Sequence, residues 1–134
     1  MPLKYIEQET IMNASIAINA YSKTRKQTIS SQDIGYNVIS RALHKLDANL
    51  SILIFNDDTK EAAKAFERSL LTIYFLQKSL DFSTETDLAK NLHKLYEFCR
   101  VTLLKKGISG SQGDPELTKC HSFIHEIMKS WDTL

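Results

Sequence analysis

Residues 84–106 read TETDLAKNLHKLYEFCRVTLLKK, and the spacing of their apolar side chains decides the class of fold. Leucine or cysteine recurs at steps of three and four residues, at Leu88, Leu92, Leu95, Cys99 and Leu103. Because an α-helix turns once in about 3.6 residues, these steps place the side chains on one face. The stretch therefore predicts an amphipathic helix whose apolar face packs against a core.

Three further segments show the same helical periodicity. Their apolar positions are Ile34, Val38, Ala42 and Leu46; Ala62, Phe66, Leu70, Ile73 and Leu80; and Leu117, Cys120, Ile124, Ile127 and Trp131. Asp58 and Asp114 stand where a side-chain oxygen can accept from unpaired N–H groups of a first helical turn. Pro115 suits a first helical position, where its missing N–H costs nothing. We predict helices over 31–55, 58–81, 84–106 and 115–132.

The connections between these helices indicate an antiparallel arrangement. Only a few residues separate the first three helices, so neighbours should run in opposite directions. Three of the four glycines lie in residues 107–113, GISGSQG, which we predict to form a loop. The weaker pattern before residue 30 fits a short helix or an arm, and residues 1–14 fit a flexible extension. The predicted fold is all-α: one domain over 1–134, an antiparallel four-helix bundle with an additional short N-terminal helix or arm.

Composition argues against several classes of partner. The net charge is +1, from 17 basic and 16 acidic residues, so no long-range field favours nucleic acid or an anionic membrane. No apolar run approaches the roughly 20 residues that span a bilayer. Lys4, Glu7 and Glu9 interrupt any signal-peptide core. With only two cysteines, Cys99 and Cys120, we expect buried free thiols in a cytoplasmic protein, although spacing alone leaves a disulfide open.

The sequence carries no motif that demands catalysis. His121 and His125 stand one helical turn apart, a spacing compatible with metal binding. Helical di-metal sites also need Glu-x-x-His pairs, which this sequence lacks, so we interpret both as surface or half-buried histidines. Nucleophile, phosphate-loop and dinucleotide motifs are missing too. We predict no enzyme, no metal and no cofactor, with a metal-dependent bundle enzyme as the weakest alternative.

Aromatic residues point instead to protein binding. Tyr74, Phe75, Tyr96 and Phe98 give the helices over 58–81 and 84–106 more apolar positions than one core face requires. Most of these residues would belong to a thick core. The surplus would line a groove for a partner helix or an extended peptide.

Several stretches resemble the FliS family of flagellar secretion chaperones. They are Ser79-Leu80-Asp81-Phe82, DLAKNL at 87–92, LYEF at 95–98, and Trp131 near the end of the last helix. In the N-terminal half, Ile18-Asn19-Ala20-Tyr21 is similar to the family's Ile-x-Ala-Tyr, and TISS at 28–31 to the start of its second helix. The resemblance runs from about residue 15 to the C-terminus, and LYEF is its most specific part.

This resemblance implies a bundle of long antiparallel helices that binds the disordered C-terminal segment of flagellin in the cytoplasm. Such binding would prevent premature polymerisation and deliver flagellin to the flagellar export apparatus. It also implies that Ile18 and Tyr21 can cover an apolar groove and contribute to contact with the export gate. The candidate partner-binding residues are Ile18, Tyr21, Ile34, Val38, Leu95 and Tyr96. The alternative for all six is an ordinary place in the core.

The predicted helix over 31–55, which corresponds to the family's second helix, departs from the family's pattern. Val38-Ile39-Ser40-Arg41-Ala42 keeps only the small Ala42, and the proline at the start of that helix is absent. Because these positions lie on the groove side, an alternative is a regulatory or scaffold protein on the same fold that binds a flagellar regulator or co-chaperone. A second copy of the chain could also fill the groove and form a homodimer.

Overall fold

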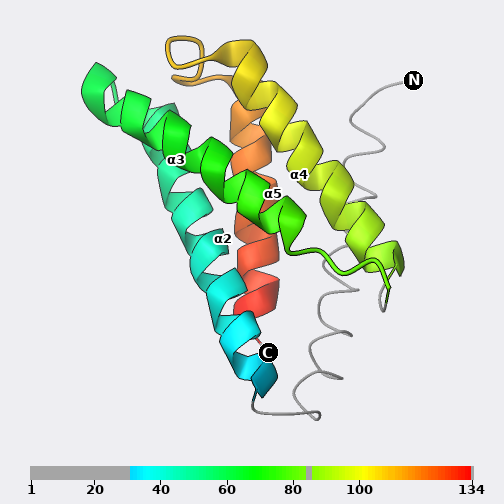
Figure 1. Cartoon of the computed structure of the whole chain (residues 1–134). Coiled ribbons are helices and arrows are strands. Elements are labelled where there is room, and N and C mark those ends of the chain that lie inside the picture. Colours follow the sequence, from blue (N-terminus) through cyan, green and yellow to red (C-terminus); the bar gives the residue numbers. More distant parts are fainter. Residues whose placement is uncertain (1–30, 84–85, 134) are drawn as a thin grey trace.

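The computed structural model describes residues 31–83 and 86–133, without the side chains of residues 31–34 and 86. This part of the chain forms α-helices and no β-strand: α2 (Ser31–Phe55), α3 (Thr59–Lys78), α4 (Thr86–Lys106) and α5 (Pro115–Asp132). Consecutive helices run in opposite directions (Figure 1). The predicted all-α, antiparallel four-helix bundle is confirmed. The predicted N-terminal helix or arm lies outside the described residues.

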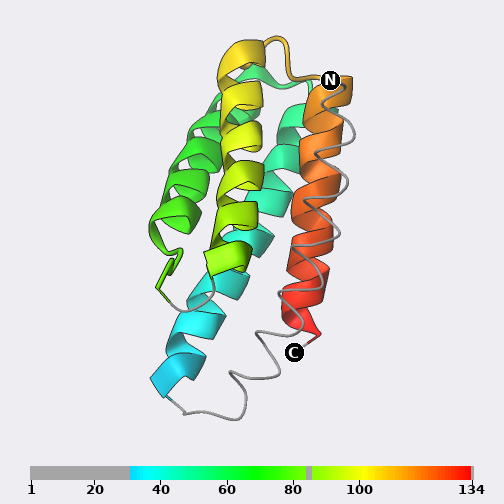
Figure 2. The ribbon, with the colours of Figure 1, turned by 90° about the vertical axis from the view of Figure 1, so that its right-hand side faces the viewer.

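The helices surround one hydrophobic core. α2 packs against α3 and α5, and α4 packs against the same two helices, so α2 and α4 lie diagonally across the bundle. Figure 2 shows the four helices side by side around this interior. Every apolar position predicted for α4 and α5 is buried, namely Leu88, Leu92, Leu95, Cys99, Leu103, Leu117, Cys120, Ile124, Ile127 and Trp131. Cys99 and Cys120 are both buried, and neither is part of a disulfide.

The face that α3 turns to the core matches the predicted one only in part: Ala62 and Ile73 are buried as predicted. Phe66, Leu70 and Leu80 are only partly buried, at the edge of the core. The deepest positions include the small residues Ala65 and Ser69. Small side chains let two helix backbones approach each other, which agrees with the extensive packing of α3 on α2. A stripe chosen by hydrophobicity alone misses this face.

α3 ends at Lys78, three residues before the predicted end. The N–H of Ser79 donates to the carbonyl of Phe75 at 3.0 Å, and its hydroxyl donates to the carbonyl of Leu76 at 2.8 Å. These bonds satisfy carbonyl groups that have no partner within the last helical turn. At the other end Asp58 is the N-cap, as predicted, and accepts from the N–H of Lys60.

The loop between α4 and α5 is tied to both helices and to α2. Gly107 and Gly113 both have φ of 66°, a left-handed conformation that glycine adopts without strain. The N–H of Gly113 donates to the carbonyl of Ile54 at 2.9 Å, which joins the loop to the end of α2. Lys106 Nζ lies 3.2 Å from Asp114, the N-cap of α5. The loop therefore holds a fixed position at this end of the bundle.

α2 and α5 are also joined near the C-terminus of the chain. The hydroxyl of Tyr36 donates to the carbonyl of Trp131 at 2.5 Å, and Trp131 Nε1 donates back to the carbonyl of Tyr36 at 3.1 Å. The two rings stack with centroids 5.4 Å apart. One aromatic pair thus supplies packing and two reciprocal hydrogen bonds between helices that are far apart in sequence.

Candidate partner-binding surface

The outer face of α3 carries a strip of exposed apolar side chains. Leu71, Tyr74 and Phe75 are 62%, 58% and 41% exposed. Their spacing of three and four residues places them on one face of the helix, away from the core positions. Lys78 Nζ lies 5.3 Å from the centroid of the Tyr74 ring, a cation–π contact at the end of this strip. We call these three residues the α3 strip.

The neighbouring helix α4 adds further exposed apolar side chains. Val101 and Leu104 are exposed and stand one helical turn apart. Phe82, just after α3, is also exposed, and its ring contacts that of His93 on α4 with centroids 6.2 Å apart. Because α3 and α4 pack against each other, these residues and the α3 strip lie on adjoining helices (Figure 1). The exposed apolar side chains of α3, of α4 and of the turn between them are candidates for contact with another protein.

A polar network joins α3 to α4 beside these apolar residues. Gln77 Nε2 donates to Glu97 Oε2 at 2.9 Å, and Arg100 Nε donates to both carboxylate oxygens of Glu97 at 3.0 and 3.1 Å. The hydrogen bond from Arg100, followed by that from Gln77, lowers the pKa of Glu97 to about 2. Glu97 is therefore ionised at neutral pH and keeps α3 and α4 in register through a charge-assisted hydrogen bond.

The six predicted partner-binding residues fall into three groups. Val38 is 39% exposed on α2, whereas Leu95 and Tyr96 are each 2% exposed in the core between the helices. Burial raises the pKa of Tyr96 above its usual range, so its hydroxyl stays protonated. Neither side chain is part of the exposed surface of the described residues. Ile18 and Tyr21, and the side chain of Ile34, lie outside the described residues.

The exposed residues on α3 and α4 are only partly those that the sequence analysis singled out. Tyr74 and Phe75 are among the surplus apolar residues predicted from the sequence, whereas Leu71, Val101 and Leu104 are not. Phe98, noted with them, is partly buried against Phe123 of α5, with ring centroids 6.3 Å apart. The sequence does contain a signal for the α3 strip. Leu71 lies three residues before Tyr74 and four before Phe75, so the three side chains share one face of the helix.

Most of the histidines lie along the α2–α5 contact. His121 Nε2 and His125 Nδ1 lie 3.1 and 3.0 Å from Asp47 Oδ1, and His44 contacts Asp132. Across residues 31–83 and 86–133, no group of three or more histidine, cysteine, aspartate or glutamate side chains could hold a metal ion. His125 and His44 thus form side-chain hydrogen bonds between α2 and α5, to Asp47 and Asp132 respectively.

None of the described helices combines the length and the apolar character that crossing a bilayer requires. Neither a comparison with curated proteins nor one with solved structures gave a match. A family model for the flagellar protein FliS matches residues 12–134, which is nearly the whole chain. This match covers all four described helices and begins close to residue 15, where the resemblance described above begins. The chain therefore belongs to the FliS family of flagellar secretion chaperones.

Proposed function

We propose that this protein is a cytoplasmic export chaperone that binds the disordered C-terminal segment of flagellin. Binding would keep that segment from polymerising prematurely and would deliver flagellin to the flagellar export apparatus. The proposal involves no chemical step and no cofactor. The observation that carries it, beyond family membership, is the apolar surface of the α3 strip with Phe82, Val101 and Leu104.

An exposed apolar surface is what binding of a disordered tail requires. Ordering a flexible chain costs roughly 1–2 kcal/mol per residue in backbone entropy, so the tail needs apolar area to bury. Burying an exposed leucine or aromatic side chain returns roughly 1.5–3 kcal/mol. Leu71, Tyr74 and Phe75 stand at the spacing that an amphipathic partner helix can match. The charged residues Lys78 and Arg100 near this surface would orient the partner.

The six residues inferred from the sequence enter this proposal in two roles. Val38, with Ile34, would extend the contact along α2. Ile18 and Tyr21 would act as a displaceable cover, whose removal would allow the partner to reach Leu95 and Tyr96. In that arrangement the cover competes with flagellin, and weakening the cover should strengthen flagellin binding.

The proposal is tested by fluorescence anisotropy with a labelled peptide from the flagellin C-terminus. We expect Leu71→Ala and Val38→Ala each to weaken binding about tenfold, since about 1.4 kcal/mol corresponds to a factor of ten. Phe55→Ala is a matched control, because Phe55 is 72% exposed but lies at the far end of α2. Tyr21→Ala should tighten binding if Tyr21 belongs to the cover.

The possible outcomes separate the two candidate functions. Loss of affinity in the α2 and α3 variants, with the control unchanged, supports a flagellin chaperone. If the full chain does not bind the peptide at tens of micromolar, the proposal fails. Recovery of a flagellar regulator or co-chaperone from a lysate, without flagellin, would then favour the alternative of a scaffold on the same fold.

A further inference from the structure

The charged residues of the bundle are divided unevenly between its helices. α3 and α4, which pack against each other, carry nine lysine and arginine residues and four aspartate and glutamate residues. Two of these four carboxylates, those of Glu61 and Glu97, pair with a cation of their own helix. α2 and α5 carry four basic and five acidic residues. The net charge of +1 therefore averages over a basic half, which also carries most of the exposed large apolar side chains.

On α3, basic side chains stand at both ends of the α3 strip. Arg68 lies three residues before the first residue of the strip, and Lys78 lies three residues after the last. These steps place both charges on the same face of the helix as the strip, and both side chains are exposed. With a rise of about 1.5 Å per residue, the two charged positions are about 15 Å apart along the helix axis.

The outward face of α4 has the same order of charged and apolar residues. Lys94, Val101 and Lys105 stand seven and four residues apart, which places them on one face, and all three are exposed. Glu97 lies on this face as well, but its carboxylate already accepts hydrogen bonds from Arg100. The outward face of α4 therefore also presents an apolar side chain between two cations.

The hydrogen bond between Gln77 and Glu97 sets the register of the two helices. Because α3 and α4 are antiparallel, a residue before Gln77 lies about level with the residue equally far after Glu97. Val101 and Leu104 are therefore about level with the α3 strip, and the cations of both helices lie beyond its ends. We call the strip, Val101, Leu104 and the cations at its two ends the α3–α4 surface; the cations are Lys78 and Lys94 at one end and Arg68 and Lys105 at the other.

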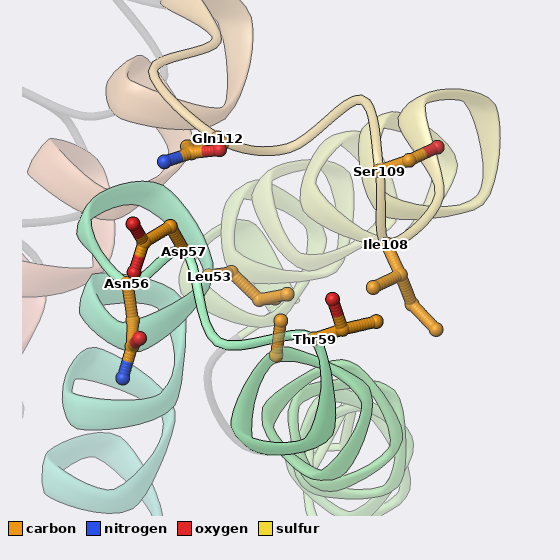
Figure 3. Close-up of a pocket in the computed structure, with 8 residues that line it drawn as sticks. Leu53, Asn56, Asp57, Thr59, Ile108, Ser109 and Gln112 are labelled. Carbon is orange, nitrogen blue, oxygen red and sulfur yellow. The ribbon is translucent and has the colours of Figure 1, made fainter.

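The α3–α4 surface ends before an acidic part of the molecule. Beside Phe55, the connection between α2 and α3 and the loop after α4 form a pocket whose lining includes Asp57 and Thr59 (Figure 3). Asp58, the N-cap of α3, adds a second carboxylate to this connection. An acidic partner segment would be repelled there, so the surface suits a segment of about three helical turns, the length between its two pairs of cations.

We propose that the α3–α4 surface binds an amphipathic helix whose apolar stripe is bounded at both ends by acidic residues, about three turns apart. A helix that packs on an apolar surface does so through side chains at steps of three and four residues. Carboxylates at the two ends of its stripe would then lie opposite the two pairs of cations. This assignment rests on the proposed function, since it names the chemistry of the segment that the same surface binds. The axial order of charge, apolar residues and charge favours a helix over an anionic membrane, which presents no such spacing.

Two designed peptides test this inference by fluorescence anisotropy with the full chain. Both carry the same stripe of leucines at steps of three and four residues; one has glutamates at both ends of the stripe, and the other has lysines at the same positions. At low salt we expect the glutamate peptide to bind about tenfold more tightly than the lysine peptide. The difference should shrink at high salt, because salt screens exposed charges. Equal affinity of the two peptides at low salt would overturn the proposal.

Charge reversal on the protein gives the matching comparison. Lys78→Glu combined with Lys105→Glu should reverse the preference, so that the lysine peptide binds more tightly than the glutamate peptide. Lys45→Glu combined with Lys129→Glu is the control, because it changes the net charge equally at exposed positions of α2 and α5. The control should keep the original preference, and thermal unfolding should show that both variants fold. A preference that the control reverses and the α3–α4 variant does not would contradict the assignment.

The same variants separate this inference from the proposed function. A flagellin peptide that binds the charge-reversed variant as tightly as the original chain would overturn the acidic helix and leave the chaperone function standing. Binding of the glutamate peptide without binding of the flagellin peptide would support the acidic helix and reject the chaperone function. Co-sedimentation of the chain with vesicles of phosphatidylcholine and phosphatidylglycerol in equal parts, without binding of the glutamate peptide, would overturn the helix in favour of a membrane.

Discussion

The Tyr36–Trp131 pair between α2 and α5 gives a prediction whose size follows from its contacts. Tyr36→Phe keeps the stacked ring but removes the hydroxyl that donates to the carbonyl of Trp131. That carbonyl lies in the last turn of α5, where no later residue of the helix can donate to it. The substitution therefore leaves a helix-end acceptor without its partner.

The expected loss of stability is about 1 kcal/mol, the usual net contribution of one intramolecular hydrogen bond. Tyr36→Leu removes the stacked ring as well, and an aromatic pair adds roughly 0.5–1.5 kcal/mol beyond its burial. The total for Tyr36→Leu is then about 2 kcal/mol. Tyr74→Phe serves as a control, because Tyr74 lies on the exposed face of α3, and it should change stability by less than about 0.5 kcal/mol.

Urea unfolding followed by tryptophan fluorescence measures these differences, since Trp131 is the chain's single tryptophan and is itself part of the contact. With a slope of about 2 kcal/mol per molar urea, Tyr36→Phe should lower the midpoint by about 0.5 M and Tyr36→Leu by about 1 M. If Tyr36→Phe unfolds at the same urea concentration as the original chain and the control, the hydroxyl contributes nothing and the reasoning is wrong.

Three further predictions concern α3, α4 and the loop. Ser69 is fully buried, and its hydroxyl has no hydrogen-bond partner among the described residues. Ser69→Ala should therefore increase the free energy of unfolding by about 1 kcal/mol and raise the urea midpoint accordingly. A lower midpoint would contradict this. A Cβ at Gly110 would lie 2.3 Å from the carbonyl oxygen of Lys106. Gly110→Ala should therefore lower the melting temperature by several degrees. An unchanged melting temperature would show that the loop adapts to the added methyl group. The lowered pKa of Glu97 stabilises the fold above the unfolded carboxyl value of 4.5, and this contribution is lost as the pH falls toward about 2. Glu97→Gln should therefore flatten the fall in urea midpoint between these pH values, and a curve parallel to that of the original chain would refute the assignment.

The sequence is sufficient to predict the helices and most of the core, because apolar periodicity and helix caps are local signals. Asp114 with Pro115 places the start of α5 correctly, and the α4 stripe from Leu88 to Leu103 is buried throughout. The α3 stripe is less accurate, since close packing against α2 favours small residues such as Ala65 and Ser69 over larger apolar ones. Hydrophobicity does not report how closely two helices approach each other.

The residues of the candidate surface are harder to predict from the sequence than the helices are. Leu95 and Leu104 are both leucines on α4, yet Leu95 is in the core and Leu104 is exposed. Leu95 belongs to the predicted α4 stripe and Leu104 does not, so their helical phase separates them although their residue type does not. The pocket beside Phe55 has no sequence signal either, because it forms where the α2–α3 connection meets a loop some 50 residues later, through a hydrogen bond from Gly113 to Ile54.

The central claim, that this chain captures the disordered C-terminal segment of flagellin, is tested most directly by calorimetric titration of that peptide into the full chain. We expect saturable binding at tens of micromolar or tighter, with a favourable enthalpy and a negative heat-capacity change, since the tail becomes ordered while apolar surface is buried. Absence of any binding heat at several temperatures, with the chain shown to be folded by its Trp131 fluorescence, would contradict the account.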